Sequence, residues 1–317
     1  MTKDTKKEIL AAIDRPLRIG TRQSPLAMAQ ASMVANALLS IHGWRPDQVE
    51  LVPMIASGDK IQDRALAEIG GKALWTKELD RALGNGEIDC AVHSMKDVET
   101  IRPGEFILAA MLERADVHDR LIGADSIDAL AERAVVGTAS PRRKAQLLRQ
   151  RNDLDIRLIR GNVQARLKKI EDGEYDATLL AAAGLKRLDM DDVGAEISNE
   201  IMLPAPAQGA IGVEVRSEGS HVRRLMHAIS STNTFRAVTA ERLFLEQLTA
   251  DCHSPVAAMA TVDGATIHLR AEILLPDGSQ FVDGKASFDT GDVSAPGILA
   301  DTLLGQASAE LKAVFGR

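Results

Sequence analysis

This chain is organised around the stretch Gly86-Glu87-Ile88-Asp89-Cys90-Ala91-Val92-His93-Ser94-Met95-Lys96-Asp97. Cys90, Ala91 and Val92 are apolar, and we expect them to end a fully buried strand. Four of the next five side chains can exchange hydrogen bonds or protons. Ligands of open α/β sheets bind beyond the carboxyl ends of the strands, so the pattern predicts a site with Asp97 as its catalytic carboxylate. The alternative is a helix N-cap with a surface ion pair.

This stretch has a counterpart in Gly173-Glu174-Tyr175-Asp176-Ala177-Thr178-Leu179. The segment before each copy is also repeated, because the strand Leu17 to Thr21 followed by Ser24-Pro25 resembles the strand Ala134 to Thr138 followed by Ser140-Pro141. Serine is a favourable helix N-cap, and proline is favourable at the first helical position. Two copies in the same order predict two α/β domains of similar topology with a cleft between them.

The pattern of strands and helices sets the domain boundaries that we expect. Domain 1 comprises residues 15–112 and 210–229, and domain 2 comprises residues 113–209. The apolar run 210–215 would return as a strand to domain 1 and complete a two-stranded hinge that permits closure over a ligand. Domain 3, residues 230–317, is a smaller α+β domain that we expect to end in one amphipathic helix over 296–315.

Elements within these domains follow from periodicity and turn residues. We expect further strands at 49–55, 156–159, 256–262, 266–275 and 280–288, and helices at 26–40, 75–83, 142–151 and 234–248. The polar, glycine-bearing segment at residues 59–73, between the strand 49–55 and the helix 75–83, is typical of a mobile loop.

Composition excludes several classes of protein. The 317 residues are 45% hydrophobic, only 3% aromatic, and carry a formal net charge of −7, which disfavours a nucleic-acid binder. The first ten residues are charged and lack an apolar signal core, and no later segment approaches the ~18 apolar residues that span a bilayer. We therefore expect a cytoplasmic protein with no membrane partner. It has no long apolar surface helix that would require a partner chain, so we expect a monomer.

Positive charge is nevertheless concentrated in residues 141–170, where ten Lys or Arg face only Asp153 and Asp155. Arg142 and Arg143 fall in the first turn of a predicted helix, where cations oppose the helix dipole unless an anion binds there. Arginines at several strand ends would suit a ligand with many carboxylates, because each guanidinium can grip one bidentately. Phosphate is the competing ligand, but the chain has no phosphate-binding glycine loop.

The two cysteines differ in their surroundings. Cys90 lies in an apolar strand and is predicted to pack in the core. Cys252 lies in a polar loop beside His253, where a covalent role as nucleophile or anchor competes with a buried, inert thiol. Neither cysteine has the spacing of a metal site, and we predict none.

Five ordered motifs resemble those of the porphobilinogen deaminase family, also called hydroxymethylbilane synthases. They cover roughly Leu17 to Met259 and are Thr21-Arg22-Gln23-Ser24-Pro25-Leu26-Ala27, His93-Ser94-Met95-Lys96-Asp97, Arg160-Gly161-Asn162-Val163, Ala183-Gly184-Leu185-Lys186-Arg187-Leu188 and Pro206-Ala207-Gln208-Gly209-Ala210. The resemblance implies two domains like the halves of a periplasmic binding protein, with a third, smaller α+β domain. It implies condensation of four porphobilinogens, with loss of four ammonia molecules, on a dipyrromethane cofactor, followed by hydrolysis to hydroxymethylbilane.

The resemblance also implies roles for individual residues. Asp97 is implied as the catalytic carboxylate, and Cys252 as the thioether anchor of the dipyrromethane. The residues implied to bind the cofactor are Lys96, Ser140, Arg142, Arg143, Arg166 and Lys72. The residues implied to bind substrate or the growing chain are Arg22, Ser24, Gln30, Arg160, Arg166, Arg187 and Gln208. His93 either orients the turn or takes part in the chemistry.

Some residues depart from the family pattern. Glu68 stands where a lysine is usual, which leaves Lys72 as the basic contact of that loop, and Trp75 and Glu99 replace a phenylalanine and a proline. Asp251, beside Cys252, should disfavour the thiolate. Two other functions stay open on the residues alone. One is a non-catalytic, hinge-closing binder of an organic polycarboxylate, and the other is a phosphate-ester enzyme.

Overall fold

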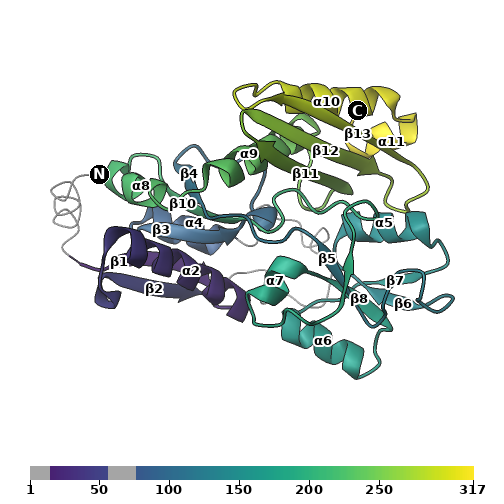
Figure 1. Cartoon of the computed structure of the whole chain (residues 1–317), viewed down its shortest axis with the longest axis horizontal. Helices are drawn as coiled ribbons and strands as arrows, with labels where there is room; N and C mark the ends of the chain where they lie inside the picture. Colours follow the sequence, from purple (N-terminus) through teal and green to yellow (C-terminus); the bar gives the residue numbers. More distant parts are fainter. Residues whose placement is uncertain (1–14, 56–75) are drawn as a thin grey trace. The chain divides into compact units, whose positions relative to one another are not determined.

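The computed structural model describes residues 15–55 and 76–317 (Figure 1). It divides into two compact units, whose described parts are residues 15–55, 76–114 and 210–235 for the first and residues 115–209 and 236–317 for the second. The predictions for Lys72, Glu68 and Trp75, and for the loop at 59–73, lie outside the described residues.

The first unit contains a five-stranded sheet in the order β2-β1-β3-β10-β4. Its strands are β1 (Leu17–Arg22), β2 (Val49–Met54), β3 (Cys90–Ser94), β4 (Phe106–Met111) and β10 (Ile211–Arg216). β1 is parallel to β2 and β3, whereas β10 runs antiparallel to β3 and β4. The prediction that 210–215 returns to the first sheet is therefore confirmed. The helical segments of this unit are α2 (Pro25–His42), η1 (Pro46–Gln48), α4 (Lys77–Gly84), η3 (Met95–Asp97) and α8 (Ser220–His227).

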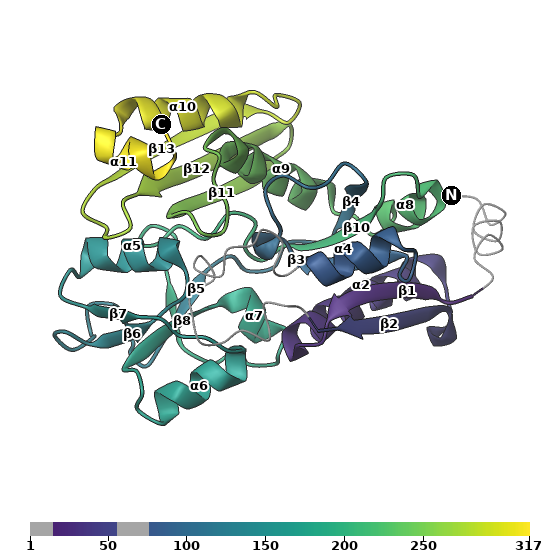
Figure 2. The same cartoon turned by 180° about the vertical axis from the view of Figure 1, so that it is seen from behind.

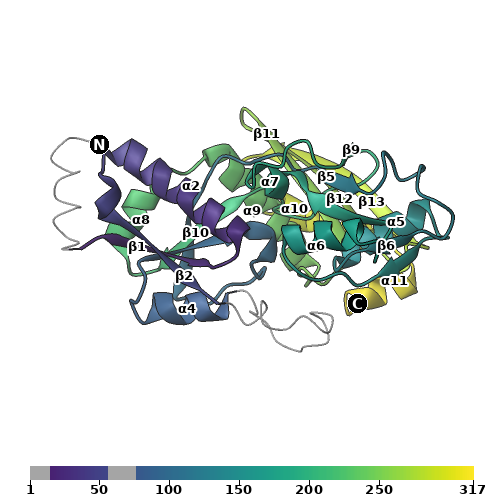
Figure 3. The same cartoon turned by 90° about the horizontal axis from the view of Figure 1, so that it is seen from below.

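Helix α2 begins and ends where its sequence signals predict. The Ser24 hydroxyl accepts a hydrogen bond from the Ala27 amide at 3.3 Å, and Pro25 occupies the first helical position. Gly43 ends the helix in the left-handed conformation, at φ 66°, which glycine adopts without steric cost. Figure 3 shows α2 and α4 on opposite sides of β1 and β2.

Strand β3 is buried on both faces, as its apolar sequence predicts. Cys90 and Val92 pack into the cluster that includes α2, whereas Ala91 packs into the cluster of α4, because successive side chains of a strand point to opposite faces. The prediction that the strand ends at Val92 is wrong by two residues. His93 and Ser94 still pair with β10, since backbone pairing continues after the side chains become polar.

The second unit begins with another five-stranded sheet, in the order β7-β6-β8-β5-β9. Its strands are β5 (Asp119–Ile122), β6 (Val135–Gly137), β7 (Asp155–Arg157), β8 (Ala177–Ala181) and β9 (Ala195–Ile197), and its helices are α5 (Pro141–Gln150), α6 (Val163–Glu171) and α7 (Ala182–Lys186). β6 is parallel to β7 and β8, and β5 is antiparallel to β8. Both sheets therefore consist of three parallel strands followed by an antiparallel one. This shared arrangement confirms the predicted duplication.

The repeated Gly-Glu-x-Asp sequence forms the same structure in both units. Gly86 and Gly173 have φ values of 70° and 71°. The Asp89 carboxylate accepts from the Arg18 amide at 2.8 Å, and the Asp176 carboxylate accepts from the Val135 amide at 2.6 Å. Each aspartate therefore ties the start of one parallel strand to the start of the next, and this is the physical reason for the repeat.

The same repeat explains why a glycine precedes the threonine in Gly20-Thr21 and in Gly137-Thr138, near the ends of β1 and β6. A Cβ on Gly137 would lie 2.9 Å from Cβ of Ile159 and 3.0 Å from Cδ1 of Tyr175. A Cβ on Gly20 would collide with Cδ1 of Ile88, the residue that corresponds to Tyr175. Each strand glycine thus leaves room for the third residue of Gly-Glu-x-Asp, and a larger side chain would overpack the core.

The second unit also contains a three-stranded antiparallel sheet of β11 (Val256–Asp263), β12 (Thr266–Leu274) and β13 (Phe281–Asp289). Its helices are α9 (Thr232–Gln247), which starts in the first unit, α10 (Ala295–Gln306) and α11 (Ala309–Val314). The prediction of one final helix over 296–315 is wrong. Ala307 leaves the helical conformation, and Ser308 caps a second helix by accepting from the Leu311 amide.

The three-stranded sheet packs against two sets of helices within this unit. Figures 1 and 2 show α10 and α11 along one face of the sheet and α5 beside β11 and β12. The fold class, two similar α/β domains and a smaller α+β domain, is confirmed, while the residue boundaries of the three domains stay predictions. Within the described ranges, no helix is long and apolar enough to cross a membrane.

Candidate active site

The short 3-10 helix η3 presents the predicted catalytic residue at the end of β3. Met95 anchors this turn, because its side chain is buried against Gly212 of β10 and its amide donates to the Ala210 carbonyl at 3.1 Å. Lys96 and Asp97 follow and are half-buried. Among the residues that the structure describes, none pairs with the Asp97 carboxylate, so this acid is available to a ligand.

Three predicted substrate residues lie near this turn or at the end of the neighbouring strand β1. The buried Gln30 amide donates to the Ser94 hydroxyl at 3.2 Å. Arg22 ends β1, which is the parallel neighbour of β3, so the carboxyl ends of the two strands meet at one edge. Ser24 follows and caps α2, but a hydroxyl that accepts a bond can still donate one.

A buried ionic cluster, which the sequence did not predict, lies behind the turn. His93 Nε2 is 3.4 Å from the Glu214 carboxylate, and Glu214 is fully buried. Arg102 binds the same carboxylate bidentately, with its Nε at 2.9 Å and its Nη2 at 2.7 Å from the two oxygens. One signal for this cluster was present in the sequence, because Glu214 is a charged residue inside the apolar run 210–215 and a buried charge needs a partner.

Arg102 uses all five of its N–H donors in the cluster. Besides Glu214 it donates to Glu99 at 2.6 Å, to Asp80 at 2.5 Å and to the Thr76 hydroxyl at 3.3 Å. These bonds join α4, β10 and the segment after Asp97. They also explain the departure at Glu99, which here receives a cation and the Thr76 hydroxyl.

Glu214 is the carboxylate in this cluster whose pKa is clearly lowered. Burial alone would raise the pKa of Glu214, but hydrogen bonds from His93 and Arg102 outweigh burial and bring it down to about 2. Burial raises the pKa of Asp80, and Arg102 offsets only part of that change. His93 and Arg102 therefore favour the ionised form of Glu214.

In the second unit, Asp119 joins the two arginines that were predicted to bind the cofactor. Asp119 Oδ2 accepts from Arg142 Nη2 at 2.9 Å, and Oδ1 accepts from Arg143 Nη2 at 2.7 Å. All three side chains are buried. Burial would raise the pKa of Asp119, but the two guanidiniums hold it far below its usual range.

This arrangement corrects the argument from the helix dipole. Arg142 and Arg143 do lie in the first turn of α5, but a protein carboxylate, Asp119, relieves the conflict, so a ligand anion is not required for that purpose. One carboxylate still neutralises only one of two guanidiniums. The trio keeps one positive charge, which is a physical reason for it to attract an anion.

Arg187 differs from Arg142 and Arg143 in its surroundings. Burial lowers the pKa of Arg187 to about 10, and no carboxylate in the described part of the chain offsets this. Its Nη2 donates to the Gly209 carbonyl at 2.6 Å, while its buried Nε has no partner in the structure. An incompletely paired, desolvated cation is the clearest candidate for an anion contact in this unit.

The remaining predicted residues of the second unit differ in their burial and in their hydrogen-bond partners. Arg160 is half-buried after β7, and Arg166 donates from Nε to the Gly161 carbonyl at 3.0 Å. Ser140 caps α5 by accepting from the Arg143 amide at 3.4 Å. Gln208 is fully buried, and its amide nitrogen donates to Val117 and Asp119. Gln208 therefore contacts the protein's own groups rather than an open surface.

The two cysteines are as different as their sequences predict. Cys90 is fully buried, and burial raises the pKa of its thiol. Cys252 is exposed, in a loop where Asp251 accepts from the His253 amide at 2.8 Å. The hypothesis of a buried, inert thiol is therefore wrong for Cys252, and the accessible position suits a covalent role.

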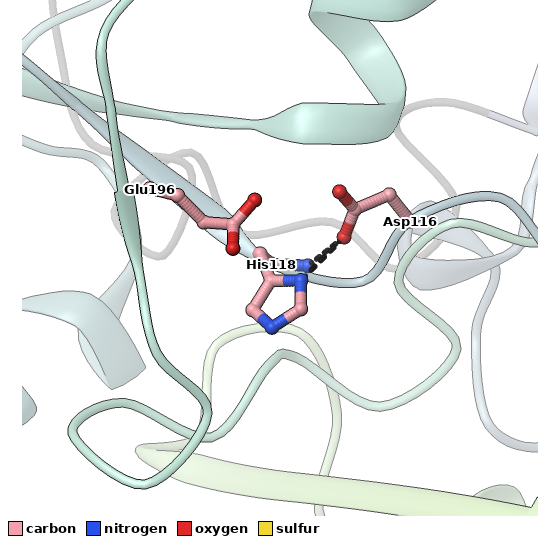
Figure 4. Close-up of side chains that lie close together, drawn as sticks. All are labelled: Asp116, His118 and Glu196. Carbon is pink, nitrogen blue, oxygen red and sulfur yellow. Dashed lines mark hydrogen bonds and ion pairs between the residues drawn. The ribbon is translucent and has the colours of Figure 1, made fainter.

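One further cluster has the chemistry of metal ligands. Figure 4 shows Asp116, His118 and Glu196 close together, with ligand atoms within 4.8 Å of one another. His118 Nδ1 is 2.6 Å from Asp116, and Glu196 is 3.5 Å from Arg120. These protein partners account for the groups, and we assign no metal to them.

Three features define an α/β protein suited to an organic anion: duplicated α/β sheets, a carboxylate after β3 with no partner among the described residues, and incompletely neutralised arginines in the second unit. The chain matches the family described as porphobilinogen deaminase, dipyromethane cofactor binding domain, over residues 17–224, and that described as porphobilinogen deaminase, C-terminal domain, over residues 235–304. It is 54% identical over 314 residues to the porphobilinogen deaminase of Sphingopyxis alaskensis, covering 96% of this chain and 98% of that protein. It is 46% identical over 299 residues to the porphobilinogen deaminase of Paracoccus denitrificans, covering 93% and 96%. The chain belongs to the porphobilinogen deaminase family.

Membership of this family decides between the functions left open by the sequence. The protein is a transferase of tetrapyrrole biosynthesis that condenses four porphobilinogens on a dipyrromethane cofactor and releases hydroxymethylbilane. The non-catalytic binder and the phosphate-ester enzyme are thereby disfavoured.

Solved structures with a similar arrangement are more distant. One is the VFT2 domain of Bordetella pertussis BvgS, at 11% identity and a TM-score of 0.42, covering 76% of this chain and 97% of that one. Another is a periplasmic binding protein of Salmonella typhimurium with high arginine specificity, at 12% identity and a TM-score of 0.40, covering 68% and 91%. Likenesses this weak support no conclusion about this chain.

The depressed pKa of Glu214 predicts a contribution to stability that depends on pH. A folded pKa of about 2 against an ordinary 4.5 stabilises the folded protein above pH 4.5 by roughly 3 kcal/mol, and this is lost as the pH falls toward 2. We expect Glu214→Gln to be less stable than wild type at pH 7, with the difference shrinking in acid. Urea unfolding between pH 3 and 7 measures this, with the exposed Asp125→Asn as control. A constant difference would contradict the assignment.

The unpaired charge of Arg187 predicts that this residue serves binding rather than folding. Arg187→Met should leave stability within about 1 kcal/mol of wild type, because it removes a desolvated cation that lacks a carboxylate partner, yet raise the KM for porphobilinogen about tenfold or more. Arg143→Met is the matched variant. It removes two hydrogen bonds that the buried Asp119 accepts and one that the Leu179 carbonyl accepts, and should cost roughly 2–4 kcal/mol. Thermal unfolding and steady-state kinetics test both, and a large stability loss in Arg187→Met would be inconsistent with this assignment.

Proposed function

We propose that Asp97 performs the proton transfers of the condensation, that Cys252 carries the dipyrromethane, and that the enzyme works as a cytoplasmic monomer. The first part of this proposal rests on Asp97, a half-buried acid just after β3 whose carboxylate has no partner within residues 15–55 and 76–317. Both cysteines are free, Cys90 in the core and Cys252 on the surface, which suits a reducing compartment such as the cytoplasm.

The position of Asp97 suits the chemistry of each addition. Porphobilinogen must lose its amine as ammonia, which leaves a cation on the substrate. A carboxylic acid can donate a proton to the departing amine, and the resulting carboxylate can then stabilise the cation. The same carboxylate can accept the proton that the attacking pyrrole loses. The buried Met95 and the Gln30–Ser94 bond fix the turn from which Asp97 acts.

The residues present fit a dipyrromethane, because an exposed thiol and a cationic trio with one uncompensated charge suit a ligand that is tethered and carboxylated. When bound, the cofactor supplies the primer on which the pyrrole chain is built. We infer that Cys252 anchors it and that its carboxylates are held by Lys96, Ser140, Arg142, Arg143, Arg166 and Lys72.

A second set of residues is proposed to bind substrate and the growing chain. Its members are Arg22, Ser24, Gln30, Arg160, Arg166 and Arg187. Each pyrrole brings an acetate and a propionate, so the number of carboxylates rises with every addition. Arginine suits this task because its guanidinium stays charged and binds a carboxylate through two parallel hydrogen bonds. The desolvated Arg187 supports the proposal most directly.

The role of Asp97 is tested by Asp97→Asn. We expect kcat to fall by ~10²–10⁴, with unchanged thermal stability because Asp97 has no described partner to lose. The exposed Asp125→Asn serves as a control that alters charge equally. Turnover close to the wild-type rate would remove Asp97 from the mechanism.

The role of Cys252 is tested by intact-mass measurement. Wild-type protein and Cys90→Ala should both carry the covalent mass of a dipyrromethane and give its colour reaction, whereas Cys252→Ser should carry neither, because only the exposed thiol can form the thioether. A modified Cys252→Ser protein, or an unmodified but active wild type, would refute the anchor.

A further inference from the structure

The segment Ala207-Gln208-Gly209 holds an unfavourable backbone conformation in the second unit. Ala207 has φ 62°, a left-handed value that costs a non-glycine residue free energy, and Gly209 has φ 82°. A Cβ on Gly209 would lie 2.5 Å from the Ala115 carbonyl oxygen. Such conformations persist only where the surroundings over-determine them, and they cluster at functional sites.

Strong hydrogen bonds fix this segment from both sides. The Ala207 amide donates at 2.6 Å to Glu241, a fully buried carboxylate of α9. The Gly209 carbonyl accepts from the Ala115 amide at 3.2 Å. The segment is therefore a rigid turn, and the side chain between these two anchors, Gln208, has a fixed direction.

Gln208 donates both of its amide protons to one chain segment, residues 117–119. Its Nε2 donates to the Val117 carbonyl at 2.7 Å and to Asp119 Oδ1 at 2.8 Å. The same Asp119 oxygen accepts from Arg143 at 2.7 Å, and the other oxygen accepts from Arg142 at 2.9 Å. Gln208 thus helps to set the orientation of the carboxylate that aligns both arginines.

The neighbouring residue holds the third cation. The Gly209 carbonyl accepts from Arg187 Nη2 at 2.6 Å. Two consecutive residues of one rigid turn therefore contact both cationic groups that we assign to carboxylates, the Arg142–Arg143 pair through Asp119 and Arg187 directly.

We propose that Gln208 is a positioning residue, which acts on ligand binding through Asp119 and the Arg142–Arg143 pair instead of touching substrate. This replaces the expectation that Gln208 contacts the pyrrole chain, and it rests on the proposed function of those two arginines as carboxylate ligands. A neutral amide suits the place, because it donates to Asp119 without adding a charge. A glutamate there would cancel the positive charge that the trio retains.

The test is a double-mutant cycle between Gln208→Leu and Arg142→Met in the full-length enzyme. Gln208→Leu should raise the KM for porphobilinogen about tenfold and leave kcat within about threefold, because it misaligns the arginines that hold the cofactor to which porphobilinogen is added, without touching the reacting atoms. Added to Arg142→Met, it should raise KM by less than about threefold further, since the pair through which it acts is already broken. Gln150→Leu, which removes an amide bonded to the Gln146 and Ile201 carbonyls in the same unit, is the control and should change neither constant.

The outcomes separate this proposal from the one on which it rests. Effects of Gln208→Leu and Arg142→Met that multiply fully, or an unchanged KM in a folded Gln208→Leu, would overturn the positioning role. An Arg142→Met enzyme with normal KM and normal covalent cofactor content would instead overturn the proposed function of the arginines. If thermal unfolding shows that Gln208→Leu does not fold, Gln208→Asn, which keeps the amide but shortens its reach, takes its place in the same cycle and is judged by the same limits.

Discussion

The carboxylate of Asp119 is the group on which the cationic part of this protein depends. Two arginines in one buried helical turn would repel each other and oppose the helix dipole, and each would lose its hydration. Asp119 offsets these costs by accepting from both guanidiniums, while Gln208 donates to the same carboxylate. Because the ratio is one anion to two cations, the arginines are stabilised and the group still keeps one positive charge. A second aspartate would make the trio a closed ion-pair cluster, and no aspartate would leave two uncompensated charges.

The first unit contains a buried ionic network of the same kind, but with more carboxylates than arginines. Here one cation, Arg102, serves three carboxylates, and all of its donors are used. This cluster lies behind the turn that carries Asp97. The two units share a topology and a Gly-Glu-x-Asp turn, but one buried cluster has more acidic residues than arginines and the other has more arginines than acidic residues. Both sheets share the same frame, and the residues at the strand ends distinguish the acid that we propose for proton transfer from the cations that we propose as carboxylate ligands.

Most of the fold could be predicted because its signals are local. Ser24-Pro25 and Ser140-Pro141 mark helix starts, the two Gly-Glu-x-Asp copies mark strand starts, and the apolar run after residue 209 marks a returning strand. The errors occurred where no local signal decides, as at Ala307, where an amphipathic pattern continues across a break between two helices. The ionic partners could not be predicted, since Asp119 is 23 residues from Arg142 and Arg102 is 112 residues from Glu214. The family resemblance supplied residue types, but not which of them the protein itself already pairs.

That distinction changes how a set of arginines found in a sequence should be interpreted. A guanidinium counted from sequence is a candidate ligand for any anion, but its availability depends on how much of its charge the fold has already neutralised. Arg143 is bound on Nε, Nη1 and Nη2, whereas Arg187 gives one bond to a carbonyl and keeps a buried, partnerless Nε. Arg187, which has no carboxylate partner among the described residues, is therefore the arginine most available to an anion. Arg142 also keeps a buried Nε without a partner there, and Arg143 offers only the residual charge of its trio. A growing polycarboxylate chain suits such a graded set, because the chain must be held at each addition and still move on, which uniformly strong pairs would prevent.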